Sequence, residues 1–170
     1  GTYRFGRYRK NDAPNVRLVP SEGIDAADIA RMAEAAALAR DLINTPSNDM
    51  GPEELAQAAQ ALATRFGASF NCIVGDDLLQ QNFPLIHAVG MASTRAPRLI
   101  DLSWGDPSHT KVTLVGKGVC FDTGGLDLKP SSGMLIMKKD MGGAANVLAL
   151  AQMVMDAKLK VRLRVLIPAV

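Results

Sequence analysis

The second half of the sequence carries the pattern that most restricts the fold. A β-branched run at residues 112–115 reads as a buried strand, and a glycine-rich stretch follows it. A helical pattern covers residues 143–157, and a second apolar run follows at residues 161–167. Two strands joined by a helix should lie parallel in one sheet. The sequence therefore predicts a β-α-β unit within an α/β protein.

The first half of the sequence predicts further helices and strands around this unit. Helices are expected at 24–44, 52–66, near residue 78 and at 84–91, and strands at 68–74 and 98–104. In the first helix the apolar stripe contains Ile29, Met32, Ala36 and Ile43. The strand at 98–104 is followed by a Gly-Asp-Pro turn, which favours a hairpin with 111–115. We expect a mixed, largely parallel sheet with helices on both faces.

Composition excludes several classes of protein. The chain has 170 residues, a net charge of +2 and no apolar run of membrane-spanning length. Aromatic residues and cations alternate at residues 3–10, which would fit either a nucleic-acid patch or an edge strand. No further basic cluster follows, so we expect the edge strand, then a linker at 11–20. Cys72 and Cys120 are expected to be free thiols of a reducing compartment.

Three charged side chains in the glycine-rich region predict a metal site. Asp122 follows the 112–115 run and precedes two glycines, and Asp140 precedes Gly142 and Gly143 at the start of the next helix. Two carboxylates that loops bring together can bind a divalent metal. Taken alone, two solvated turn aspartates would be the better interpretation. Lys117 changes this, because a lysine directly after a buried strand must be paired or lose its proton, and a neutral amine can bind metal.

The neighbouring charged residues have separate interpretations. Lys129, if it stays charged, would stabilise an oxyanion that forms beside the metals. Asp127, Lys138 and Lys139 are interpreted as solvated or ion-paired residues. His87 is expected to be a core or surface residue, because no second histidine lies nearby.

Two other kinds of site fit the same region less well. The phosphate-binding pattern G-x-x-x-x-G-K-[ST] is absent around Lys117. Asp122, Thr123 and Gly124 match the Asp-Thr-Gly turn of aspartic proteases, but those proteins are all-β. The predicted helices contradict that class.

Residues 115–130 and 137–145 together resemble the leucyl aminopeptidase (cytosol aminopeptidase) family, with fixed spacings over the whole pattern. Residues 44–53 also resemble the beginning of its catalytic domain, and residues 3–8 resemble the tail of the domain before it. The resemblance implies metal ligands at Lys117, Asp122 and Asp140, with Asp122 bridging two metals. It implies that Lys129 is catalytic and that Met137 lines the substrate pocket.

The resemblance also implies what the whole protein does. The expected activity is release of N-terminal leucine and other apolar residues from peptides, with two divalent ions per subunit. These would be manganese or zinc, with magnesium as a further option. A cytoplasmic homohexamer is implied, and composition predicts no membrane partner and makes nucleic acid an unexpected one. A non-catalytic binding protein that keeps the fold is the alternative.

The family completes its site with a later Asp-Ala-Glu-Gly-Arg segment, which the 170 residues do not contain. From the resemblance of residues 3–8 we expect residues 1–20 to be the tail of a preceding domain with its linker. Residues 21–170 would be the first half of the catalytic domain. The remaining ligands would lie beyond Val170, so this chain by itself is expected to be inactive.

Overall fold

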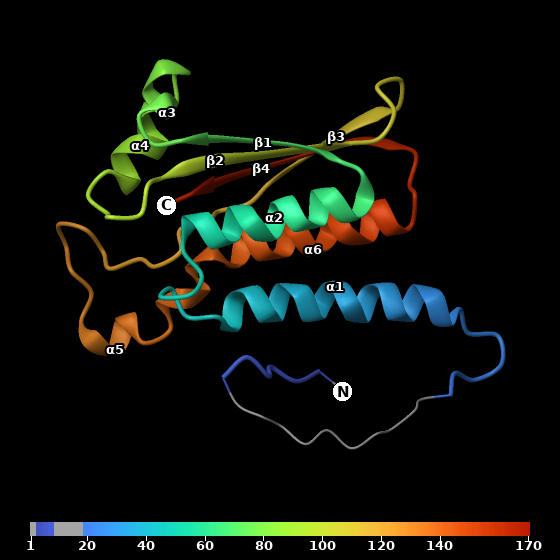
Figure 1. Cartoon of the computed structure of the whole chain (residues 1–170). Helices are drawn as coiled ribbons and strands as arrows, with labels where there is room; N and C mark the ends of the chain where they lie inside the picture. Colours follow the sequence, from blue (N-terminus) through green and yellow to red (C-terminus); the bar gives the residue numbers. More distant parts are fainter. Residues whose placement is uncertain (1–2, 9–18) are drawn as a thin grey trace.

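The computed structural model describes residues 3–8 and 19–170 (Figure 1). In chain order the elements are α1 (Ala26–Asn44), α2 (Pro52–Phe66), β1 (Ser69–Val74), α3 (Asp77–Gln80), α4 (Pro84–Gly90), β2 (Arg98–Trp104), β3 (Thr110–Val115), α5 (Ser131–Met134), the 3-10 helix η1 (Met137–Met141), α6 (Gly142–Asp156) and β4 (Val161–Ala169). Most of the linker expected at 11–20 lies outside the described residues. The helices and strands predicted from residue 24 onwards are confirmed to within a few residues.

The four strands form one sheet in the order β1-β2-β4-β3. β3 and β4 are parallel and α6 connects them, which confirms the β-α-β unit. β1 with β2 and β2 with β4 are antiparallel. The prediction of a mixed sheet is confirmed, but a largely parallel one is wrong for the strands described.

The predicted hairpin between β2 and β3 is also wrong, because β4 lies between these two strands. Leu163, Val165 and Ile167 of β4 are fully buried, so this strand takes a central position in the sheet. The turn between β2 and β3 favours pairing of these two strands, which are neighbours in the sequence. Burial of the apolar side chains of β4 instead places that strand between them.

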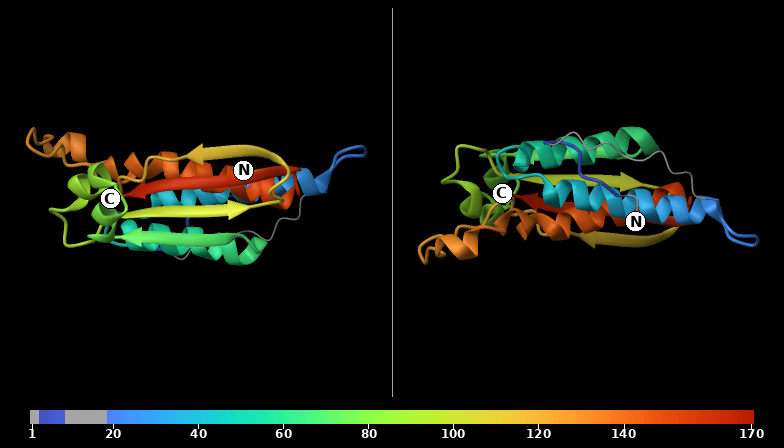
Figure 2. Two further views of the ribbon diagram at one scale, coloured as in Figure 1. Left: turned by 90° about the horizontal axis from the view of Figure 1, so that it is seen from above. Right: turned by 90° about the horizontal axis from the view of Figure 1, so that it is seen from below.

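Helices α2 and α6 cover one face of the sheet, and α1 packs against α6 on the side away from the strands (Figures 1 and 2). The main core lies between the sheet and these helices and contains Ile100, Leu102 and Leu148, all buried. Full burial of one such side chain stabilises the fold by about 1.5–3 kcal/mol. This packing fixes the C-terminal end of β3 relative to the N-terminal end of α6. The predicted site residues lie in the segment between these two ends.

The buried face of α1 differs from the predicted stripe. Ala35, Ala39 and Leu42 are buried, whereas Ile29 and Met32 are 48% and 49% exposed. Small alanine side chains let the axis of α1 come close to α6, so the larger side chains lie at the margin of the contact. The pattern of large apolar residues therefore identified the helix but not its contact face.

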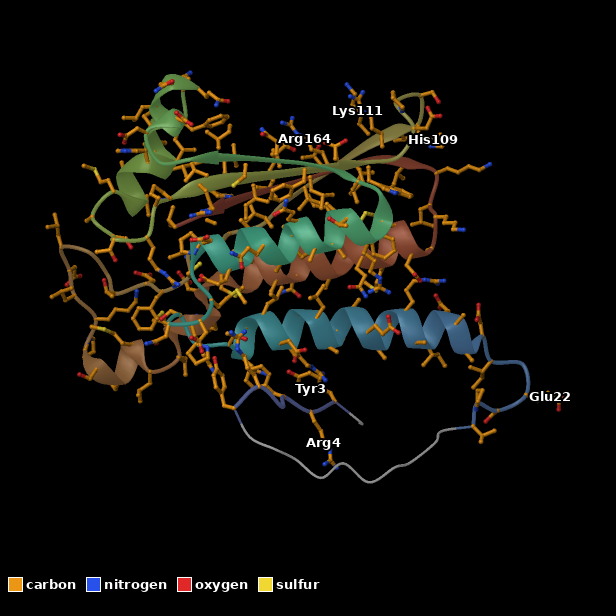
Figure 3. The ribbon with its side chains drawn as sticks, viewed as in Figure 1. Tyr3, Arg4, Glu22, His109, Lys111 and Arg164 are labelled. Carbon is orange, nitrogen blue, oxygen red and sulfur yellow. The ribbon has the colours of Figure 1, made fainter. Side chains whose placement is uncertain are left out.

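Among the described residues, the opposite face of the sheet is covered at one end, by α3 and α4 (Figure 1). Leu78 of α3 packs there against Ile73 and Leu99. Helices therefore lie on both faces, as predicted, but unequally. β3 lies at an edge of the sheet and Val115 is 66% exposed, so the prediction that this strand is buried is wrong. Away from α3 and α4 this face carries polar side chains such as Lys111 and Arg164 (Figure 3).

Residues 3–8 form no strand, so the predicted edge strand is wrong where the structure describes it. The Tyr3 hydroxyl donates a hydrogen bond to Asp41 at 2.7 Å, and the Tyr8 hydroxyl donates one to Asp49. These carboxylates on α1 and just beyond it hold the segment against the helix (Figure 3).

Two other sequence predictions concern the cysteines and the membrane. Cys72 is half-buried, Cys120 is buried and both are free thiols, as predicted. Of the helices in the described part of the chain, none combines the length and apolar character that a membrane crossing needs.

Candidate metal centre

The backbone of Lys117 is held against the first turn of α6. The amide of Ala144 donates to the Lys117 carbonyl at 2.9 Å. A Cβ on Gly143 would lie 2.8 Å from the Lys117 backbone nitrogen, so only glycine permits this approach. The glycine pair that the sequence places after Asp140 therefore lets two distant segments meet.

This contact brings Lys117 to Asp140. The Lys117 Nζ lies 2.9 Å from Asp140 Oδ2. Despite this short distance Asp140 Oδ2, which is buried, accepts no hydrogen bond of adequate geometry. The contact is therefore a charge interaction without a hydrogen bond. A buried carboxylate oxygen without a hydrogen bond is costly, and a bound cation would satisfy it.

The second pair joins Asp122 and Lys129 across one loop. The Lys129 Nζ lies 2.5 Å from Asp122 Oδ2, and the amide of Gly124 donates to Asp122 Oδ1 at 2.8 Å. The amide of Lys129 in turn donates to the Thr123 carbonyl at 2.9 Å and closes the loop. Gly124 has a φ of 97°, a conformation that favours glycine.

The surroundings of the Asp122 carboxyl lower its pKa. The hydrogen bond from Lys129 lowers this pKa most, followed by the hydrogen bond from Gly124. The charge of Lys117 lowers it further, so the two lysine–aspartate pairs share one electrostatic neighbourhood. Asp122 is therefore an ionised carboxylate at neutral pH.

The other residues singled out in the sequence lie in η1, in the loop before Lys129 and on α4. Met137 begins η1 and is half-buried, and Asp127 is exposed in the loop before Lys129. Lys139 is also exposed, whereas Lys138 is half-buried and its Nζ donates to the Asn44 carbonyl at 3.1 Å. Sequence patterns gave no indication of this last contact. His87 lies on α4, and its Nε2 is 3.1 Å from Asp76 Oδ1.

The donor set fits a metal only if lysine takes part. Within residues 3–8 and 19–170, no three His, Cys, Asp or Glu side chains gather closely enough to hold an ion. Asp122 and Asp140 supply oxygen ligands, and Lys117 would supply nitrogen once it loses its proton. The unsatisfied Asp140 Oδ2 is the observation that favours this set of ligands.

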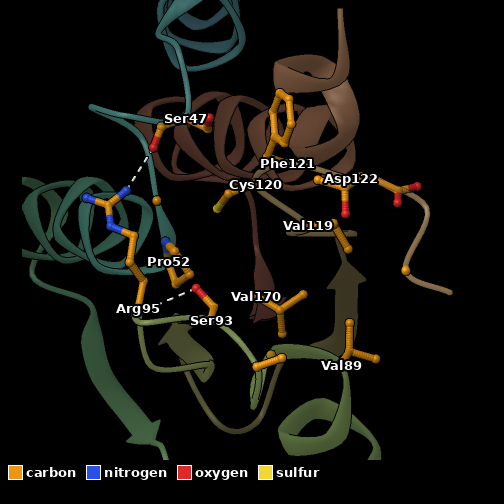
Figure 4. Close-up of a pocket in the computed structure, with 15 residues that line it drawn as sticks. Ser47, Pro52, Val89, Ser93, Arg95, Val119, Cys120, Phe121, Asp122 and Val170 are labelled. Carbon is orange, nitrogen blue, oxygen red and sulfur yellow. Dashed lines mark hydrogen bonds between the residues drawn. The ribbon is translucent and has the colours of Figure 1, made fainter. Parts of the chain in front are cut away.

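A pocket of about 530 Å³ lies beside Asp122 (Figure 4). Arg95 forms one wall, where its guanidinium donates to the Ser47 carbonyl at 2.8 Å and to Glu54 Oε1 at 2.9 Å. Cys120 also lines the pocket. Arg95 and Glu54 were not singled out in the sequence, because no local pattern connects residues so far apart.

The scaffold settles one alternative for the Asp-Thr-Gly turn. Asp122 lies on an α/β framework with long helices α1, α2 and α6, not in an all-β protein. Its carboxylate is paired with Lys129, whereas aspartic proteases share a proton between two carboxylates. The aspartic-protease interpretation is therefore wrong.

Comparisons with known proteins identify the family of this chain. The model of a family described as "Cytosol aminopeptidase family, catalytic domain" matches residues 37–170. A probable cytosol aminopeptidase from Syntrophotalea carbinolica is 42% identical over 185 residues, which cover 99% of this chain and 37% of the relative. The chain thus spans little more than a third of that relative's length.

Solved structures give the same result. The crystal structure of cytosol aminopeptidase from Coxiella burnetii matches with a TM-score of 0.94 and 53% identity, over 99% of this chain and 36% of that one. The bottromycin maturation enzyme BotP in complex with Mn matches with a TM-score of 0.78 and 40% identity, over 84% of this chain and 31% of that one.

Proposed function

This chain belongs to the cytosol aminopeptidase family, and from that premise we propose that the full-length protein is a metal-dependent aminopeptidase. It releases N-terminal residues from peptides, with leucine and other apolar residues preferred. Residues 21–170 form the first half of its catalytic domain, and residues 1–20 are the tail and linker of a preceding domain.

One observation supports the proposal most directly: Asp140 Oδ2 is buried and accepts no hydrogen bond. Lys117, Asp122 and Asp140 are the proposed ligands, with Asp122 shared between two ions. Two divalent ions held there would activate a water molecule and polarise the scissile carbonyl. Manganese is the first ion to test, because the similar BotP is described in complex with Mn.

The residues of this chain have distinct proposed roles. Lys117 would bind a metal ion through a neutral amine, whereas Lys129 would act as a charged ammonium. The loop closed by Thr123 and Gly124 holds Lys129 next to Asp122, so its ammonium can donate to the carbonyl oxygen of the substrate as negative charge develops there. Met137 lines the pocket for the first side chain of the substrate. Cytoplasmic location and a homohexamer complete the proposal.

The proposal is tested with the full-length protein and leucyl-p-nitroanilide. We expect hydrolysis that 1,10-phenanthroline abolishes and that Mn²⁺ or Zn²⁺ restores, while pepstatin has no effect. N-acetylleucyl-p-nitroanilide, which lacks the free amine, should not be hydrolysed. Hydrolysis that survives complete removal of metal would refute the proposal. Metal binding without hydrolysis of any peptide would favour the non-catalytic binding protein.

A further inference from the structure

The C-terminal end of α1 has no cation of its own. The last carbonyls of a helix lack partners within the helix, and their partial negative charge favours a nearby cation. The last turn of α1 contains no basic residue. The Asp41 carbonyl is satisfied by Thr45, whose amide and hydroxyl donate to it at 3.1 and 2.7 Å. The Asn44 carbonyl must find its partner elsewhere.

Lys138 supplies that partner from a distant segment. Its Nζ donates to the Asn44 carbonyl at 3.1 Å, and its side chain is half-buried in the contact between α1 and η1. The next residue, Lys139, is exposed and its side chain forms no hydrogen bond or ion pair with the residues that the structure describes. Two adjacent lysines therefore differ in their surroundings.

η1 is fixed at two points, and Asp140 lies between them. Met141 is 1% exposed and belongs to the main core. Lys138 fixes the other side through α1. A 3-10 helix of five residues has poor hydrogen-bond geometry and little stability of its own, so its shape depends on such contacts.

We propose that Lys138 is a positioning residue: by binding the C-terminal carbonyl of α1, it fixes η1 so that Asp140 is held in place for the metal. This inference rests on the proposed function of the site. The Lys138 side chain binds α1 and not the proposed ligands, so it would act only through the backbone that carries Asp140. Outer contacts of this kind typically change metal affinity or activity about 10–100-fold when they are removed.

The test uses the full-length protein with Lys138→Met, Lys138→Arg and the matched control Lys139→Met. Methionine keeps the apolar stem but has no donor, whereas arginine keeps a charged donor. Two quantities are measured: Mn²⁺ affinity by calorimetry, and amide hydrogen exchange of residues 137–141 in the metal-free protein. Steady-state kinetics and thermal unfolding accompany them.

We expect Lys138→Met to bind Mn²⁺ about 10–100-fold more weakly and to exchange faster at residues 137–141, without a matching loss of global stability. Lys138→Arg should recover most of the affinity, and Lys139→Met should resemble the wild type. Equal behaviour of Lys138→Met and Lys139→Met in both measurements would overturn the inference. If Lys138→Met does not fold, Lys138→Gln takes its place, and failure of both to fold would overturn it in favour of a general structural role.

Failure of the proposed function gives a different result. If the wild type neither binds Mn²⁺ nor hydrolyses peptides, the metal proposal fails, yet hydrogen exchange still decides whether Lys138 holds η1. Faster exchange in Lys138→Met than in Lys139→Met would then support the positioning role alone.

Discussion

The two lysine–aspartate pairs of the site look alike in sequence but are built differently. Lys117 and Asp140 come from separate elements, the end of β3 and η1, and meet at the start of α6. Lys129 and Asp122 belong to one loop, whose backbone hydrogen bonds hold them together. The Asp140 side chain is 14% exposed and the Asp122 side chain 36%.

This difference determines what each pair can offer a cation. Asp122 already accepts hydrogen bonds from Gly124 and is paired with Lys129, so its charge is satisfied without a metal. Asp140 Oδ2 faces Lys117 without a proper hydrogen bond. The pair made by tertiary contact is therefore the less satisfied one, and it should depend more on the bound ion.

The largest expected effect tests both aspartates. In the full-length protein, Asp122→Asn and Asp140→Asn should each abolish hydrolysis of leucyl-p-nitroanilide and weaken Mn²⁺ binding by more than about 100-fold, beyond the effect of an outer contact. An amide cannot neutralise a dication. Metal content by atomic emission and steady-state kinetics measure the loss. Near-normal metal content in either variant would remove that residue from the ligand set.

Substitutions of the two lysines should have the next largest effects, and the two effects should differ in kind. Lys117→Arg should lose metal, because a guanidinium does not deprotonate to become a ligand. Lys129→Ala should keep its metal but lose about 10²–10³ in kcat, with the loss mainly in kcat rather than KM. Metal stoichiometry and kinetics of both variants decide the matter. Metal loss in Lys129→Ala with retention in Lys117→Arg would show that the roles are reversed.

Glycine substitutions break one pair at a time. Gly143→Ala places a Cβ 2.8 Å from the Lys117 nitrogen and should separate Lys117 from Asp140. Gly124→Ala forces alanine into a positive φ of 97° and against the Asp127 carbonyl, so it should disturb only the Asp122 loop. Each should cost about 1–3 kcal/mol of unfolding free energy. Urea unfolding and Mn²⁺ affinity provide the measurement.

Gly142→Ala is the matched control for Gly143→Ala. Its nearest neighbour would be Ile43 Cδ1 at 3.7 Å, an ordinary contact, and alanine favours the helix by up to about 1 kcal/mol. We expect unchanged or slightly higher stability and normal metal binding. A comparable loss in both variants would mean that crowding against Lys117 is not the cause.

The smallest effect concerns the start of the Asp122 loop, which is anchored where the Cys120 amide donates a hydrogen bond to the Val170 carbonyl at 2.8 Å. The Cys120 thiol reports on this anchored end of the loop. Burial raises the pKa of this thiol to about 12. The folded pKa of the thiol exceeds its ordinary value of 9.0. The contribution of the protonated thiol to the free energy of unfolding is therefore complete below pH 9 and is lost as the pH rises towards 12. At pH 8 the folded protein should therefore leave Cys120 unmodified by DTNB, while half-buried Cys72 reacts slowly.

The Cys120→Ala variant identifies which thiol reacts, and urea should expose both. Rapid modification of Cys120 in the folded protein would show that the anchored end of the loop opens. The contrast between a fixed loop and a pair that depends on tertiary contact would then weaken.

The sequence alone determined the β-α-β unit, the limits of most helices and the residues of the candidate site. The periodicity of apolar residues indicates which side of a strand or helix is buried. Gly124 and Gly143 indicate where the backbone adopts a positive φ or approaches another segment closely. The family resemblance assigned roles that residue chemistry only partly supplied, and those roles stay predictions.

Only the tertiary structure decided which segments meet. The insertion of β4 between β2 and β3, the alanine face of α1 and the exposed edge at Val115 follow from packing between elements far apart in sequence. The same holds for Lys138. Its sequence context does not distinguish it from a solvated or ion-paired lysine, and only the packing of η1 against α1 brings its Nζ to the Asn44 carbonyl. Local patterns encode how one segment folds, whereas the partner of a side chain depends on the free energy of the whole packed arrangement.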